Sequence, residues 1–310
     1  MAANGDRRLL SGRALSLESL AVPKRVAQSL LVARRMTARV RRRTLRVGSF
    51  ELPFLEGGQG EPLVLLHGFS DSKDSFVDVA RSFVPTRRVI LPDLPGFAEA
   101  SQPLDFRYSL DRMVELFSKF IDSLGLARFD LVGNSLGGAI SAAYALERPE
   151  RVRSLALLGA AGVPMPCPSP LQQRIEAGDN PFVCTSLEDH AALLSMVFET
   201  PPPMPAPLRA HLAREYIARA PLNAKILDDL LEGGFDISDR LEALRSPTLL
   251  LWGDRDRLID VSAGHVYHQR VPEARLVILH GVGHCPQYEV PGRTAKILHG
   301  FMRRSSTQHP

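Results

Sequence analysis

This chain lacks any long apolar run. No stretch reaches the length of about 18 apolar residues that a membrane-spanning helix needs. In the N-terminal segment the longest apolar run, Leu30 to Ala33, is too short for the apolar part of a secretory signal. We therefore expect a cytoplasmic protein without a recognisable signal peptide, in which any membrane contact is peripheral.

Cysteine is also scarce. Cys167, Cys184 and Cys285 are far apart and form no CxxC pair, and an odd number excludes a complete disulfide framework. This favours a reducing compartment. Cys285 directly follows His284, but we expect it to be a packing residue, because an unpaired cysteine usually behaves as a small buried apolar side chain.

Acidic residues are nearly missing from the N-terminal segment. Residues 1–50 contain twelve Lys and Arg but only Asp6 and Glu18 as acids, which is a net charge of +10. The net charge of the whole chain is +4, so the remainder carries −6. No aromatic residues are interleaved with the basic ones, and we expect no nucleic-acid partner.

The basic segment, residues 1–43, is predicted to hold one amphipathic helix. Residues 1–22 look irregular, whereas residues 23–43 have apolar side chains at helical spacing and Arg mostly on the other side. Such a helix could contact an anionic membrane surface, cap the domain as a solvated helix, or belong to an Arg-rich transit segment. The sequence leaves these alternatives open.

From Thr44 onward, strand patterns alternate with helical patterns. Residues 44–47 and 51–56 flank Gly48-Ser49 as a hairpin. Six apolar strand patterns follow at 62–68, 87–93, 129–135, 154–160, 248–254 and 274–281, separated by helical patterns at 73–84, 109–124, 136–148, 261–270 and 291–303. This alternation predicts an α/β fold with a mostly parallel central sheet flanked by helices. We assign 44–160 and 247–305 to this core and 306–310 to a tail.

Residues 161–246 interrupt the rhythm. They contain helical patterns but no strong strand, and they lie between two strands of the same sheet. We expect a helical lid over the carboxyl edge of the sheet. Its proline-rich run, 199–207, is interpreted as a stiff loop between helices.

A nucleophile motif follows the strand 129–135. Gly133-Asn134-Ser135-Leu136-Gly137 has the G-x-S-x-G pattern between a strand and a helix. The serine of such a turn has a strained backbone, so that only small residues fit two positions before and after it. We predict that Ser135 is a nucleophile held clear of the sheet.

A serine hydroxyl needs a base, and the base needs an acid that orients it. In this order of elements the histidine comes last, and His284 lies in a loop after the final strand. The acid should follow the preceding strand, where Asp254 and Asp256 compete. We choose Asp256 because it lies further along the turn, and we expect Asp254 to be a turn or cap residue.

Acyl transfer also needs donors for the oxyanion. The backbone N–H of Leu136 opens the helix after Ser135, and the N–H of Phe69 lies in the loop after the strand 62–68. We predict that these two amides form the oxyanion hole and that His67 holds the loop. Asp93, after another strand, is expected to bond loop N–H groups.

Taken in order, LHGFSDSKDSF, DLPGF, LVGNSLGG, LWGDRDRLID and GVGHCPQYEVP resemble the α/β-hydrolases over residues 44–304. HGFS followed by xxKDxF, the LIDVS run and the segment NPFVCTSLEDHAALLSMVF resemble monoacylglycerol lipases and related bacterial lipases and esterases. The chain departs from them in its basic N-terminal helix, where relatives have a hydrophobic anchor, and in Ala98-Glu99-Ala100, where relatives often have Gly-x-Ser.

The resemblance implies a serine hydrolase of carboxylic esters, such as monoacylglycerols or short and medium acyl esters, without metal or organic cofactor. Five apolar residues of the lid are candidates for an acyl pocket, or else form only its buried face: Phe182, Leu193, Leu194, Val197 and Phe198. LVGNSLGG also resembles C–C bond hydrolases of meta-cleavage products, although their oxyanion loop usually carries a Ser-Gly-Pro-Gly-like run. A catalytically silent binding protein of the same fold is the remaining alternative.

Overall fold

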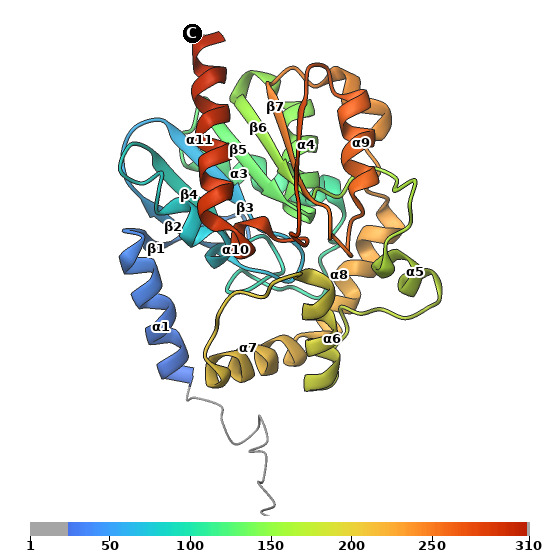
Figure 1. Cartoon of the computed structure of the whole chain (residues 1–310). Coiled ribbons are helices and arrows are strands. Elements are labelled where there is room, and N and C mark those ends of the chain that lie inside the picture. The colour runs from blue at the N-terminus through green and yellow to red at the C-terminus, as the bar shows by residue number, and fades with distance from the viewer. Residues whose placement is uncertain (1–23, 309–310) are drawn as a thin grey trace, which may run out of the picture.

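The computed structural model describes residues 24–308, which form an eight-stranded sheet between two layers of helices (Figure 1). The irregular segment expected at residues 1–22 and the end of the predicted tail lie outside the described residues. The strands are β1 (Arg41–Val47), β2 (Phe50–Gly57), β3 (Pro62–Leu66), β4 (Arg88–Pro92), β5 (Phe129–Asn134), β6 (Val152–Leu158), β7 (Thr248–Gly253) and β8 (Arg275–Leu279).

The order of strands in the sheet is β1-β2-β4-β3-β5-β6-β7-β8. β2 is antiparallel to both of its neighbours, whereas β4, β3, β5, β6, β7 and β8 are parallel. The carboxyl ends of β3, β5, β6, β7 and β8 therefore follow one another along a single edge. This order confirms the predicted α/β-hydrolase fold, and it brings the loops that carry the candidate residues to one rim.

Helices cover both faces of this sheet. α3 (Leu110–Ser123), α4 (Leu136–Glu147) and α9 (Val261–Arg270) pack on one face, and α2 (Val77–Ala80) and α11 (Pro291–Gln308) on the other. Within β3, Val64 and Leu66 face the first layer, and Leu63 and Leu65 face the second. Because both faces are covered, the strand is a continuous apolar run.

The segment between β6 and β7 is helical. It contains α5 (Pro170–Glu176), α6 (Leu187–Val197), α7 (Ala206–Ala218), α8 (Ala220–Gly233) and the short 3₁₀ helix η4 (Ser238–Ala243). Figure 1 shows α5 to α8 gathered at one end of the sheet, opposite the end of α11. We call residues 161–246 the cap.

The N-terminal helix is shorter than the 23–43 pattern suggests. α1 spans Lys24–Thr37, and Arg41–Arg43 belong to β1, where they pair with Phe54, Leu55 and Glu56 of β2. Arg39 has a φ of 57°, which is incompatible with a continued helix, and the buried Val40 directly precedes β1. The expectation of one helix through residue 43 is therefore corrected.

One face of α1 is attached to the domain and the other is exposed. Ala27 and Arg35 are buried, and α1 contacts α7 of the cap. The outward face exposes four large apolar side chains: Val26, Leu30, Val32 and Met36. In the part of the chain that the structure describes, no helix is both long and apolar enough to cross a bilayer.

Candidate active site

Ser135 occupies a strained turn between β5 and α4. Its φ of 55° and ψ of −121° lie where a residue with a side chain is rarely found. A Cβ at Gly133 would overlap the carbonyl oxygen of Gly137, and a Cβ at Gly137 would overlap that of His67. Backbone contacts within this turn and with the end of β3 thus require the small residues of the motif.

The turn is fixed by its backbone hydrogen bonds. The N–H of Ser135 donates to the carbonyl of Leu158 at 3.0 Å, and its carbonyl accepts the N–H of Ala161 at 3.1 Å. Leu136 is the first residue of α4, where backbone N–H groups have no acceptor within the helix. The amide predicted to stabilise an oxyanion therefore directly follows the serine.

His284 and Asp256 form a buried hydrogen-bonded pair. The distance from His284 Nδ1 to Asp256 Oδ2 is 2.7 Å, and both side chains are almost fully buried. Because Nδ1–H donates to the carboxylate, Nε2 is the ring nitrogen left to accept a proton. The backbone N–H of His284 donates to the carbonyl of Val197, at the end of α6, at 2.9 Å.

Asp254, the competing acid, faces elsewhere. Its carboxylate accepts the backbone N–H of Gly281 at 2.7 Å and lies 3.0 Å from Nδ1 of His280. The side chain of His280 is 84 % exposed and follows β8, so it faces solvent. Asp254 therefore braces the turn after β8, as expected for a turn residue.

Gly159 leaves room for the His284–Asp256 pair, and the sequence patterns did not single it out. It follows β6 with a φ of 49°, and a Cβ there would lie 3.0 Å from Asp256 Oδ2 and 3.2 Å from His284 Nδ1. Any larger side chain would press on both partners. The only signal in the sequence is a glycine near the end of the strand pattern 154–160.

The loop after β3, which carries Phe69, is held by a neutral histidine. Burial lowers the pKa of His67 from 6.5 to about 4. Its Nδ1–H donates to the carbonyl of Gly68 at 2.7 Å, and its Nε2 accepts the N–H of Leu94 at 2.9 Å. Ser70 has a φ of 53°, so the loop turns sharply directly after Phe69.

A buried ion pair also supports the loop after β3. Asp93 accepts the backbone N–H of Lys73 at 2.8 Å and pairs with its ammonium group at 2.7 Å. Burial raises the pKa of Asp93 against the opposing effect of Lys73. Glu99, from the segment that departs from relatives, lies 2.8 Å from the same ammonium group. Asp93 therefore bonds loop N–H groups, as expected.

A buried amide network joins three of the loops and was missed by the sequence reasoning. The side-chain amide of Asn134 donates to the carbonyl of His284 at 3.2 Å. Gln287 donates to Asn134 Oδ1 at 2.9 Å and to the hydroxyl of Ser75 at 3.3 Å. The serine turn, the histidine loop and the loop after β3 are thus held in one fixed arrangement.

The apolar residues expected to line a pocket divide into two groups. Phe182 and Leu193 are buried and belong, with the half-buried Val197, to the same apolar cluster as Leu136. The ring of Phe182 lies 4.7 Å from that of Phe69, between ring centroids. Two further residues expected with them, Leu194 and Phe198, are half-buried and lie outside this cluster.

Cys285 is buried, and burial raises the pKa of its thiol well above the ordinary value. Its thiol faces Asn134 Oδ1 at 3.7 Å. A thiol kept protonated in this way is a poor nucleophile. This environment agrees with the expected packing role.

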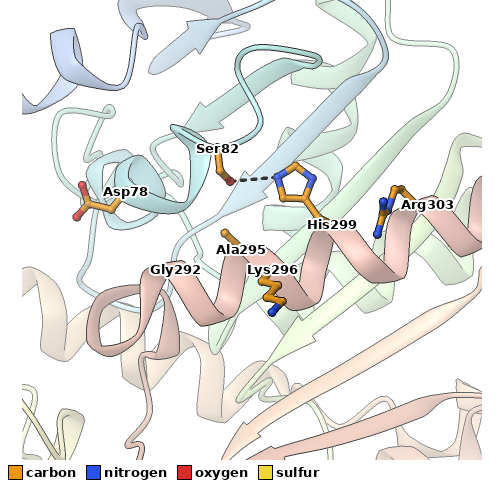
Figure 2. A pocket seen from close by; sticks show the side chains of 7 residues that line it. All are labelled: Asp78, Ser82, Gly292, Ala295, Lys296, His299 and Arg303. Atoms are coloured by element: carbon orange, nitrogen blue, oxygen red, sulfur yellow. Dashed lines mark hydrogen bonds between the residues drawn. The ribbon is translucent and has the colours of Figure 1, made fainter.

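A serine–histidine contact outside the candidate site lies in a surface groove between α2 and α11 (Figure 2). The hydroxyl of Ser82 is 3.2 Å from Nε2 of His299, whose ring stacks on Phe83. Burial lowers the pKa of His299, and nearby Arg side chains lower it further. Asp78, also in the groove, bonds instead to Arg34. This pair lacks both an orienting acid and a strained turn.

Comparison with known proteins identifies the family of the chain. A family model described as alpha/beta hydrolase fold matches residues 61–181. Lipase 1 of Psychrobacter immobilis is 33% identical over 258 residues, which cover 81% of this chain and 80% of that protein. The chain belongs to the α/β-hydrolase family. This membership confirms the predicted resemblance.

Other α/β-hydrolases that resemble the chain differ in their named activities. The crystal structure of a membrane phospholipase A, a novel bacterial virulence factor, has a TM-score of 0.88 and 36% identity, and the match covers 91% of this chain and 93% of that one. A 2-hydroxymuconate semialdehyde hydrolase of Pseudomonas putida is 32% identical over 81% of this chain and 90% of its own length. Monoacylglycerol lipase abhd6-B of Xenopus laevis is 27% identical over 79% of this chain and 76% of its own length. The named lipases support a carboxylic ester hydrolase.

Proposed function

We propose that this α/β-hydrolase is a serine lipase or esterase that cleaves monoacylglycerols or short and medium acyl esters. The observation that carries the proposal is the buried hydrogen bond of 2.7 Å between His284 and Asp256, at the same rim as Ser135 in its strained turn. A neutral imidazole with its Nδ1 proton held by a carboxylate is the form that can accept a proton from a serine hydroxyl.

The reaction proceeds by acyl transfer in two steps. Nε2 of His284 takes the hydroxyl proton while Ser135 Oγ attacks the ester carbonyl carbon. The backbone N–H groups of Phe69 and Leu136 stabilise the oxyanion. As the C–O bond breaks, the imidazolium returns the proton to the leaving alcohol. Water then attacks the acyl-enzyme in the same way and releases the carboxylic acid and free Ser135.

The apolar surroundings of the loop after β3 support an acyl substrate. Phe69 lies against Phe182 of the cap, and Leu193 and Val197 belong to the same apolar cluster. An alkyl chain that enters between the cap and this loop would remove apolar surface from water. The lipases among the relatives support the same substrate class.

The relative named 2-hydroxymuconate semialdehyde hydrolase favours one alternative, a C–C bond hydrolase that uses the same serine and histidine. One panel of substrates separates the two functions. It contains p-nitrophenyl esters of increasing acyl length, monoacylglycerols and a coloured dienol ketone. Turnover of esters with little turnover of the ketone is expected, and the reverse result would replace the ester hydrolase with the C–C hydrolase.

The site assignment is tested with Ser135→Ala and His284→Ala. Each should lower kcat on the best ester by several orders of magnitude, because either loss disables the nucleophile. Ser82→Ala, which changes the serine–histidine contact with His299, should leave the rate nearly unchanged. Full activity of either site variant would remove Ser135 or His284 from the mechanism.

We also propose that α1 contacts an anionic membrane surface. Its outward face combines exposed Val32 and Met36 with Arg25 along one shallow groove, and Arg39 and Arg41 lie exposed just beyond the helix. Apolar burial and attraction to anionic headgroups add up at such a face. α1 lies beside α7, at the cap end of the molecule (Figure 1).

Flotation with anionic vesicles tests this contact. Val32→Glu with Met36→Glu should abolish binding, whereas Leu104→Glu, at another exposed apolar position, should not. Equal flotation of the wild-type protein, the Val32→Glu/Met36→Glu variant and the Leu104→Glu variant would exclude α1 as the contact surface.

A further inference from the structure

Tyr288 lies where four parts of the molecule meet. It follows His284 by four residues, in the short helix α10 (Pro286–Glu289). Its hydroxyl donates to Asp71 Oδ1 at 2.9 Å, in the loop after β3. Its ring packs edge-on against Phe198 at the end of α6, and the guanidinium carbon of Arg34 in α1 lies 6.0 Å from the ring centroid.

Asp71 fixes the course of the loop after β3. The same Oδ1 that accepts the Tyr288 hydroxyl also accepts the backbone N–H of Ser72 at 2.8 Å. Asp71 lies two residues after Phe69, and the intervening Ser70 has the strained φ of 53°. A strained backbone of this kind persists only where its surroundings hold it. Asp71 is therefore the anchor that follows the turn.

The Tyr288–Asp71 hydrogen bond is the outer of two links between these loops. The inner link is the buried contact of Gln287 with Ser75 and Asn134. It reaches the loop after β3 at Ser75, six residues beyond Phe69. The outer link reaches it at Asp71, much closer to the Phe69 amide. Removal of the outer link therefore leaves the loop attached through His67, Ser70 and Ser75, but it removes one restraint on the segment that carries the oxyanion donor.

We propose that Tyr288 is a positioning residue for the oxyanion hole and acts through Asp71 on the amide of Phe69. The inference rests on the proposed function of Ser135, His284 and this amide. A donor that moves by a fraction of an ångström still allows substrate to bind, but it stabilises the transition state less. The link is expected to affect kcat and to leave KM nearly unchanged.

Kinetics of Tyr288→Phe test the proposal, because this change removes one oxygen and keeps the ring contacts with Phe198 and Arg34. We expect kcat to fall about 10-fold to 100-fold with KM within about twofold and the thermal midpoint lower by only a few degrees. Tyr108→Phe, which loses a hydroxyl bond to the carbonyl of Pro103, is the matched control and should keep its kcat. An unchanged kcat of Tyr288→Phe would overturn the proposal.

Substitutions of Asp71 distinguish positioning from general stability. Asp71→Asn keeps an acceptor oxygen and should retain most of the activity. Asp71→Leu keeps the volume without an acceptor and should lower kcat at least as far as Tyr288→Phe, because it also removes the acceptor of the Ser72 N–H. The double variant Tyr288→Phe with Asp71→Leu should be no slower than Asp71→Leu alone, since Asp71→Leu already removes the link to Tyr288. Additive losses would show that the two residues act separately and would overturn the proposal.

A boronic acid that forms a tetrahedral adduct with Ser135 supplies a second readout. Its affinity should fall in Tyr288→Phe by the same factor as kcat, because its oxygen occupies the oxyanion position. Unchanged affinity would overturn the inference. If the wild-type protein cleaves the dienol ketone and no ester, the proposed function fails, and the same variants then test the inference on the ketone.

Discussion

Asp256 divides its two carboxylate oxygens between His284 and its own turn. Oδ2 accepts Nδ1–H of His284 at 2.7 Å, and Oδ1 accepts the backbone N–H groups of Leu258 and Ile259, each at 2.9 Å. The turn thus fixes the orientation of the carboxylate independently of its bond to the imidazole. The backbone turn after β7 therefore also sets the orientation of the His284 ring.

This arrangement predicts different effects for the two neighbouring aspartates. Asp256→Asn should lower kcat by about 10³-fold to 10⁴-fold, because the amide can donate to Nδ1 and favours the wrong tautomer. Asp254→Asn, which changes only the contact with exposed His280 and Gly281, should keep most of the activity. Steady-state kinetics of both variants decide the matter, and the reverse ranking would make Asp254 the acid.

From the burial of His67 we predict that the protein loses stability in mild acid. Burial lowers its pKa to about 4 from an ordinary 6.5, so the unfolded chain takes up a proton below pH 6.5 and the folded protein does so only near pH 4. The free energy of unfolding should therefore decrease as the pH falls through this interval, by about 3 kcal/mol from this group. Urea unfolding at several pH values measures the slope.

His67→Gln supplies the control for this slope, because its side chain does not titrate. Its stability at neutral pH is expected to be lower, but the decrease between pH 6.5 and pH 4 should be smaller than in the wild-type protein. An identical slope in the two proteins would mean that other groups cause it.

The attachment of α1 predicts unequal effects for two neighbouring arginines. Arg35 forms a buried pair with Asp74, with distances of 2.7 and 2.6 Å, so Arg35→Met leaves a buried carboxylate unpaired and should cost about 3 kcal/mol. Arg34 pairs with Asp78, which is 47 % exposed, and Arg34→Met should cost at most about 1 kcal/mol. Chemical unfolding compares the two.

A double variant examines the cause of that difference. Arg35→Met with Asp74→Leu removes both charges and should be more stable than Arg35→Met alone, since no unpaired charge remains buried. If the double variant is the less stable of the two, packing rather than charge accounts for the loss.

From the position of Phe182 we predict that its effect on kcat/KM depends on the acyl length of the substrate. It is buried against Phe69, so Phe182→Ala should lower kcat/KM for the longer acyl esters about 10-fold and change it little for acetyl esters. Leu194→Ala, from the expected pocket residue outside the apolar cluster, is the matched control. Equal losses on all acyl lengths would remove Phe182 from the acyl pocket.

Local patterns allowed most of the fold to be predicted. The buried strands are continuous apolar runs, and the small residues Gly133 and Gly137 indicate the turn at Ser135. The end of α1 was missed, because its helical spacing continues through Val40 and only the positive φ of Arg39 interrupts it. Such a conformation at an arginine leaves no mark in the sequence.

Contacts between distant segments could not be predicted in this way. The Tyr288–Asp71 bond joins residues 217 positions apart, and the Arg35–Asp74 pair joins residues 39 apart. Each forms only where the folded chain brings two distant segments together. The role of Glu99 is similar, since it meets Lys73 and Arg42 only after β4 is in place.

The end of α6 is fastened to both sides of the candidate site. Val197 accepts the N–H of His284, Glu289 accepts those of Glu199 and Thr200, and Arg257 donates to the carbonyl of Ser195. An outward swing of this helix would break a bond of the histidine's own backbone. A displacement of the end of α6 would therefore also shift the backbone that carries the candidate base, so cap position and imidazole position are coupled at this corner.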